Sequence, residues 1–247
     1  MPLAAVAVLA GVAGLAFGSF AALAAYRLPR GEGVVLGRSR CPRCGHALAL
    51  ADLLPVVSWL ALGGRCRYCA APVPVRYPLI ELATAALFVL AVLAWGVTPE
   101  ALLACALALG LVIAAAADLD RLVIPDPVLV CLLPLGLAWA AVLGRPWSDT
   151  IGGLAAALAL AAALRWLGAR ARGREALGLG DVKLLAVAGA WVGLAALPWY
   201  LAGAGALGVA SGLAWRRRGG EAFPFGPALA AALFATVLWR APWPGWW

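Results

Sequence analysis

Long apolar blocks, separated by short connections that carry arginine, constrain this chain more than any other feature. A helix needs about 20 mainly apolar residues to cross the hydrocarbon core of a bilayer. Charged residues make up only 12% of the 247 residues, which is about half the share of a typical soluble protein. This composition excludes a large soluble catalytic domain. We expect an all-α membrane protein with about eight transmembrane helices, at residues 2–25, 79–96, 101–117, 128–144, 150–167, 182–197, 199–214 and 224–240.

The positions of the basic residues predict the orientation of these spans. With eight spans, 16 arginines and Lys183 fall in connections on one side, whereas Arg145 and Arg240 fall on the other. Connections rich in Lys and Arg stay in the cytoplasm, so both termini are expected outside. The net charge of +8 then reflects the orientation of the spans. We predict membrane lipid as a partner and no nucleic-acid partner.

The one sizeable polar stretch, residues 26–78, contains two Cys-x-x-Cys pairs. Cys41 and Cys44 form the first pair, and Cys66 and Cys69 form the second after 21 intervening residues. Four thiolates with this spacing favour a structural, tetrahedral zinc site. Two disulfides are the alternative, which a reducing cytoplasm disfavours, and His46 is a further candidate ligand. We predict a small cytoplasmic zinc-ribbon-like segment between the first two transmembrane helices.

Two of the 11 acidic residues stand out by position. Asp118 ends the third span, where the negative end of the helix dipole disfavours a carboxylate, so capping does not account for it. Asp181 follows Gly178 and Gly180 at the start of the sixth span, where an N-cap role is the alternative, although glycines also let an extended peptide approach closely. If these two spans are neighbours, the carboxylates share a proton, as in an aspartic protease.

The other carboxylates at span ends have simpler interpretations. We expect Asp120 to face water, and Asp126, which precedes Pro127, to act as a helix N-cap.

A series of ordered motifs runs along the chain. They comprise Gly18-Ser19-Phe20, Tyr26-Arg27-Leu28-Pro29, the four cysteines, Pro55 with Ser58-Trp59, Gly64-Arg65-Cys66, Arg76-Tyr77-Pro78 with Glu81, Asp118-Leu119-Asp120, Ile124-Pro125-Asp126, Gly178-Leu179-Gly180-Asp181-Val182-Lys183 and Phe223-Pro224-Phe225-Gly226-Pro227. In this order they resemble the motifs of type IV prepilin peptidases.

This resemblance implies a protein of the bacterial inner membrane that cleaves the basic leader of a prepilin or pseudopilin after a glycine at the cytoplasmic face. It then methylates the new amino group with S-adenosylmethionine. Asp118 and Asp181 would be catalytic, with Gly178 and Gly180 in support. No glycine-rich nucleotide fingerprint is visible, so the residues that bind the methyl donor stay unassigned, as does the oligomeric state.

The resemblance also suggests a division of the chain. Residues 1–25 would form the first transmembrane helix, 26–78 the methyltransferase-associated cysteine segment and 79–247 the polytopic peptidase domain. We further expect Asp118, Asp120, Asp126 and Asp181 to form an acidic cluster that orients the basic leader.

A transporter or proton-coupled channel is the alternative function, because intramembrane aspartates can carry protons. Its expected internal repeat is not visible, and the carboxylates lie at span ends. A third reading is an assembly platform without chemistry.

Overall fold

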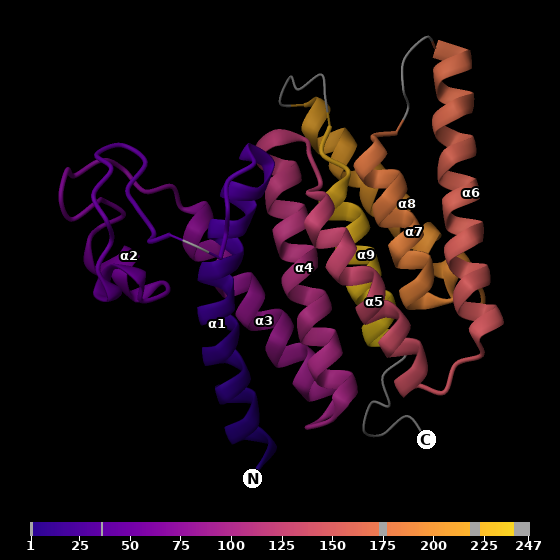
Figure 1. Ribbon diagram of the computed structural model, residues 1–247, viewed down its shortest axis with the longest axis horizontal. Coiled ribbons are helices and arrows are strands. Elements are labelled where there is room, and N and C mark those ends of the chain that lie inside the picture. Colours follow the sequence, from indigo (N-terminus) through magenta and orange to yellow (C-terminus); the bar gives the residue numbers. More distant parts are fainter. Residues whose placement is uncertain (1, 36, 173–176, 218–222, 240–247) are drawn as a thin grey trace.

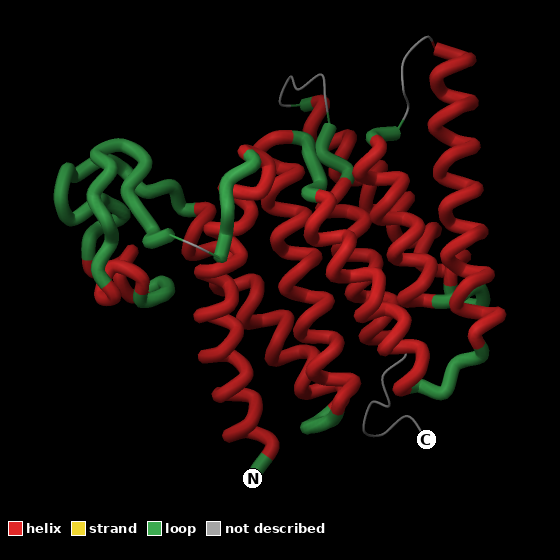
Figure 2. Tube along the Cα trace, in the orientation of Figure 1, coloured by secondary structure: helices red, strands yellow, loops and turns green. Residues whose placement is uncertain are grey.

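The computed structural model describes residues 2–35, 37–172, 177–217 and 223–239. Within these residues, eight long helices follow one another: α1 (Leu3–Arg27), α3 (Arg76–Trp95), α4 (Pro99–Arg121), α5 (Asp126–Val142), α6 (Trp147–Arg172), α7 (Leu179–Val192), α8 (Leu197–Arg216) and α9 (Gly226–Trp239) (Figure 1). Each overlaps one of the predicted spans, so the all-α prediction is confirmed. The described residues form no β-strand beyond two isolated bridges (Figure 2).

Length and composition distinguish these helices from one another. Five of them, α1, α3, α4, α6 and α8, are long and apolar enough to cross a membrane. The apolar helices α5 and α9 are shorter, with 17 and 14 residues, or about 26 and 21 Å at 1.5 Å per residue. Together they indicate a multi-pass membrane protein.

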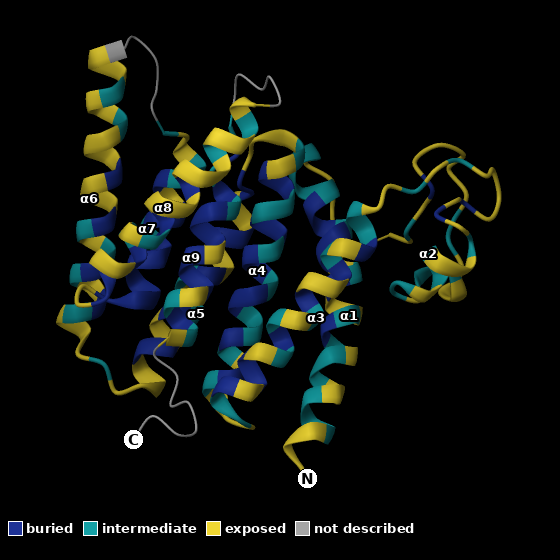
Figure 3. Ribbon diagram, turned by 180° about the vertical axis from the view of Figure 1, so that it is seen from behind, coloured by how far each residue is buried: buried dark blue, intermediate teal, exposed yellow. Residues whose placement is uncertain are grey.

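The bundle has a buried centre and an apolar exterior. Helices α1 and α6 lie at its edges, where apolar side chains such as Val8 and Ile151 are 66% and 59% exposed (Figure 3). Large apolar groups can face outwards in this way when the surrounding medium is lipid. By contrast, most of α7 is buried, from Val182 to Val192, as expected of a helix that is apolar on all sides.

Close helix packing in the bundle depends on glycine. A Cβ atom on Gly189 of α7 would lie 2.2 Å from the carbonyl oxygen of Gly153 in α6, and one on Gly14 of α1 would lie 2.6 Å from Cα of Ala85 in α3. Small residues therefore let these helix pairs approach at the backbone, as is common in membranes.

The arrangement of the central helices positions the two aspartates. Helices α4 and α7 both pack against α5 and α9. Asp118 is in the last turn of α4 and Asp181 in the first turn of α7. Helices α4 and α7 are antiparallel, so the last turn of α4 and the first turn of α7 lie at the same end of the bundle.

The cysteine segment lies beside the bundle, next to α1 and α3 (Figure 1). It contains two short elements, η2 (Leu50–Leu53) and α2 (Val57–Ala61), and η1 (Leu28–Arg30) leads into it from α1.

Candidate active site and metal centre

Asp118 is buried, with 5% of its surface exposed. Its Oδ2 atom accepts a hydrogen bond of 2.7 Å from the backbone N–H of Gly226, the first residue of α9. The N-terminus of a helix carries a partial positive charge and free N–H groups. The start of α9 therefore compensates the unfavourable position of this carboxylate at the end of its own helix.

Gly226 is needed for this contact. A Cβ atom at this position would lie 2.8 Å from Oδ2 of Asp118, too close for the backbone to donate as it does. No role for Gly226 was predicted from the sequence. Its only signal was its place in the Phe-Pro-Phe-Gly-Pro motif.

Asp181 occupies the third position of α7 and is not the N-cap residue, which is Gly178. Oδ2 of Asp181 accepts a hydrogen bond of 3.3 Å from the N–H of Gly178. Oδ1 is buried and has no hydrogen-bond partner among the described residues. One carboxylate oxygen thus stabilises the helix start, and the other is left for a different partner.

The two glycines before Asp181 have distinct contacts. A Cβ on Gly178 would lie 3.1 Å from Oδ2 of Asp181, whereas a Cβ on Gly180 would lie 3.0 Å from Cβ of Ile124. Gly180 lets the first turn of α7 pack against the connection that follows α4. This contact brings the two acidic helix ends together, and Asp118 and Asp181 interact electrostatically.

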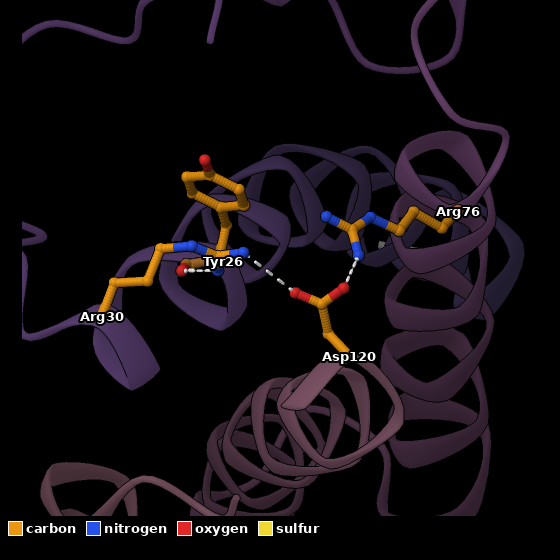
Figure 4. A network of polar contacts seen from close by, with 4 residues as sticks. All are labelled: Tyr26, Arg30, Arg76 and Asp120. Carbon is orange, nitrogen blue, oxygen red and sulfur yellow. Dashed lines mark hydrogen bonds and ion pairs between the residues drawn. The ribbon is translucent and has the colours of Figure 1, made fainter. Parts of the chain in front are cut away.

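Asp120 was expected to face water, but it lies against two arginines. Its carboxylate forms ion pairs with Arg76 at the start of α3 and with Arg30 of η1, the latter at 3.4 Å (Figure 4). The guanidinium of Arg30 also stacks over the ring of Tyr26, 3.7 Å from its centroid. The water-facing expectation was wrong because two helices far away in the sequence place their arginines at this end of α4.

Asp126 differs from its expectation as well. Pro125 is the N-cap of α5, and the carboxylate of Asp126 binds Nζ of Lys183 at 2.7 and 2.9 Å. The prediction of an acidic cluster that attracts a basic leader fails for these two residues, since cations of this chain already compensate both Asp120 and Asp126.

The four cysteines Cys41, Cys44, Cys66 and Cys69 lie together, with all four Sγ atoms within 4.8 Å of one another. None of them forms a disulfide, so the disulfide alternative is not realised. The backbone N–H of Cys44 lowers the pKa of Cys41 to about 7, whereas burial and hydrogen bonds with the other three thiols raise the pKa of Cys69 to about 12. A bound metal would displace the protons that remain on the thiols. This cluster can hold a metal ion, and its donor set fits zinc.

The two cysteine pairs sit in matching turns. The N–H of Cys41 donates to the carbonyl of His46, and that of Cys66 donates to the carbonyl of Ala71, at 3.0 and 2.9 Å. Each turn is closed by an antiparallel bridge, Arg40 with Ala47 and Arg65 with Pro72. These paired turns agree with a zinc-ribbon-like segment.

His46 lies outside the group of four thiols. Its ring stacks on Tyr68 of the second turn, with centroids 3.6 Å apart. This contact joins the two turns through their side chains.

Comparisons with known proteins match both parts of this architecture. Residues 12–95 match the model of the bacterial peptidase A24 N-terminal domain, and residues 105–213 match the type IV leader peptidase family. A prepilin leader peptidase/N-methyltransferase of Burkholderia pseudomallei is 40% identical over 226 residues, 87% of this chain and 71% of that protein. The chain belongs to the type IV leader peptidase family.

Two further relatives extend the similarity. The type 4 prepilin-like proteins leader peptide-processing enzyme of Escherichia coli O78:H11 is 36% identical and covers 96% of both chains. A prepilin leader peptidase/N-methyltransferase of Myxococcus xanthus is 39% identical over 86% of this chain and 64% of its own length. No solved structure matched the chain. Membership of the leader peptidase family gives no support to the transporter alternative.

The two matched regions meet near the turn after α3. The N-terminal region contains α1, the cysteine segment and α3, and the second region contains both Asp118 and Asp181. The ion pairs of Asp120 connect the two regions.

A cavity of about 550 Å³ lies between the cysteine segment and helices α1 and α3. Its lining includes Glu81, Trp59, Tyr77 and arginines of the cysteine segment. No local pattern in the sequence predicts this cavity, because its walls come from segments that are far apart in the chain.

Proposed function

We propose that this chain is a membrane-embedded aspartic endopeptidase that removes the leader from prepilins or pseudopilins and N-methylates the new N-terminal residue. The main support is that Asp118 and Asp181 lie together at one end of the bundle, in a chain whose relatives are named prepilin leader peptidase/N-methyltransferase.

The geometry suits hydrolysis by a carboxylate pair. One aspartate, ionised, takes a proton from water, whose oxygen forms a bond to the scissile carbonyl carbon. The other, protonated, donates a hydrogen bond to the carbonyl oxygen. The C–N bond then breaks and a proton passes to the leaving amine.

The surroundings of the pair support this division of labour. The hydrogen bond from Gly226 fixes Oδ2 of Asp118. Oδ1 of Asp181, which is buried and unpartnered among the described residues, is the oxygen available to water or to the substrate carbonyl. Gly178 and Gly180 support the site by shaping the first turn of α7.

The arginine distribution supports placement of this site at the cytoplasmic face of the bacterial inner membrane. The leader is then cleaved after its glycine on the side where the protein is made. The cysteine cluster would hold a structural zinc ion that stabilises the segment. S-adenosylmethionine would supply the methyl group to the new amine.

The test is cleavage of a purified prepilin by the full-length protein in detergent. Asp118→Asn and Asp181→Asn should each lower the cleavage rate by about a thousandfold or more, as removal of a reacting group does in other proteases. Asp126→Asn is the matched control, because its carboxylate is 63% exposed and paired with Lys183. Cleavage by both active-site variants at the wild-type rate would overturn the proposal.

A further inference from the structure

We propose that the cavity between the cysteine segment and helices α1 and α3 binds the methyl donor, S-adenosylmethionine. The inference rests on the proposed methyltransferase function and assigns its site. A volume of about 550 Å³ lies within the usual range for pockets that hold cofactor-sized molecules.

One wall of the cavity is built around Glu81, a residue of α3 that is only 7% exposed. Its Oε2 atom accepts a hydrogen bond of 2.7 Å from the N–H of Val56, and the hydroxyl of Ser19 on α1 also hydrogen-bonds to it. Three segments of the chain thus converge on one buried carboxylate.

Val56 adopts a strained conformation at this wall, with φ of 59°. A β-branched residue with positive φ is a true outlier, and such strain persists only where the surrounding structure enforces it. The hydrogen bond from Val56 to Glu81 supplies part of that enforcement. The surrounding contacts therefore hold this wall of the cavity in one defined conformation.

A rigid aromatic face forms a second wall. Nε1 of Trp59 donates to the carbonyl of Val73 at 2.9 Å. Gly64 packs against the ring, since a Cβ there would lie 2.9 Å from Cζ2 of Trp59. Together these contacts fix the indole at the cavity, which Tyr77 also lines. Fixed aromatic rings suit a purine base, which can stack on them.

The charges of the lining match a ligand that carries both signs. S-adenosylmethionine has a cationic sulfonium, a cationic amino group and an anionic carboxylate. Glu32 and Glu81 line the cavity as candidate partners of the cations, and Arg40 as the candidate partner of the carboxylate. Asp52 also lines it, but its oxygens already bind Arg67, Tyr68 and the N–H of Ala49.

The same lining disfavours the other candidate occupant, the basic leader of a prepilin. Five arginines line the cavity against three carboxylates, so the local charge repels a leader with several positive charges more strongly than a ligand with two cations and one carboxylate.

The cavity is also connected to the proposed peptidase site. Tyr26 and Tyr77 line it, and the neighbouring Arg30 and Arg76 bind Asp120, two residues after Asp118 (Figure 4). The ends of α1 and α3 thus contribute to the cavity and hold the end of α4. This arrangement places the donor on the side of the bundle where cleavage creates the new amine.

The first test is calorimetric titration of the full-length protein in detergent with S-adenosylmethionine, which carries both the sulfonium and the amino cation that Glu81 and Glu32 would face. We expect Glu81→Gln and Glu32→Gln to weaken binding at least tenfold. Glu100→Gln, in the first turn of α4, is the matched control and should bind as the wild type does. If both cavity variants bind like the wild type, the proposal is wrong.

A second test needs no variant and so does not depend on their folding. The wild-type protein is irradiated with S-adenosylmethionine labelled in its methyl group, and the adduct is located by mass spectrometry. An adduct within residues 44–81 supports the proposal. An adduct confined to residues 99–239 overturns it.

These outcomes separate the site from the function. If the wild type cleaves and methylates prepilin while the adduct lies outside the cavity, the function stands and the site is wrong. If the wild type neither binds the donor nor methylates prepilin, the proposed methyltransferase function and its site are both wrong. The proposed peptidase function is tested separately, by the cleavage rates of the aspartate variants.

Discussion

The backbone N–H of Gly226 donates a 2.7 Å hydrogen bond to the carboxylate of Asp118, although 108 positions separate the two residues. The start of α9 is thereby placed against the end of α4. An acidic residue that its own helix disfavours gains a compensating dipole and a fixed orientation from another helix.

Replacement of Gly226 should disrupt this contact. In Gly226→Ala the added methyl group would lie 2.8 Å from Oδ2 of Asp118, so the carboxylate or α9 must shift. We expect prepilin cleavage to fall by about a hundredfold, as displacements of 1 Å can cause. Gly205→Ala is the control, since a Cβ there meets nothing within 4 Å. Equal cleavage rates for the two variants would contradict the assigned role of Gly226.

The ion pairs of Asp120 should couple the N-terminal region to α4. Asp120→Asn weakens two partly buried ion pairs, and we expect it to lower the melting temperature more than Asp126→Asn, whose pair is exposed. A double-mutant cycle of Asp120→Asn with Arg76→Met should give a coupling of about 1 kcal/mol or more. Strictly additive effects would show that the pairs do not hold the two regions together.

The contact of α6 with α7 should tolerate no side chain at its glycines. Gly189→Ala would place Cβ 2.2 Å from the carbonyl of Gly153, and overpacking of this kind costs about 1–3 kcal/mol or more. Thermal unfolding in detergent should show a clear loss of stability, with Gly205→Ala again as the control. A melting temperature equal to that of the control would mean that the two helices do not pack as closely as described.

The cysteine cluster should bind one zinc ion per chain. Elemental analysis of purified protein is expected to give one equivalent, which Cys41→Ser and Cys66→Ser should abolish or sharply reduce. Cys131→Ser is the matched control, because that thiol is exposed on α5 and lies outside the cluster. Zinc retained by the first two variants would exclude the four-thiolate site.

The stability of the cysteine segment should depend on the ionisation of Asp52. The hydrogen bond from Arg67, 2.6 Å long, holds the pKa of Asp52 below its ordinary value. A lowered pKa contributes stability that is fully present above the unfolded value of about 3.9 and is lost as the pH falls through the folded value.

Hydrogen exchange measures this effect. At pH 7, Asp52→Asn should lower amide protection in residues 49–68 relative to the wild type, and the difference should shrink as the pH approaches 3. A difference that stays constant between pH 7 and 3 would show that the charge of Asp52 is not involved.

Local patterns in the sequence were sufficient to predict the helices and the cluster of four cysteines. The eight helices follow from apolar blocks, since a run of apolar residues in lipid must satisfy its own backbone. The paired turns follow from two Cys-x-x-Cys motifs, in which each pair of ligands is only three residues apart. Both patterns lie within short stretches of sequence, so they can be recognised without knowledge of the tertiary structure.

Tertiary structure alone decided the partners of the carboxylates. Asp118 and Asp181 stood out by position, yet the N–H of Gly226, the arginines that bind Asp120 and the lysine that binds Asp126 come from other helices. Which groups meet there depends on how α4, α5, α7 and α9 pack. The sequence therefore determined that acidic groups stand at helix ends, and helix packing determined which of them are neutralised and which oxygen remains free.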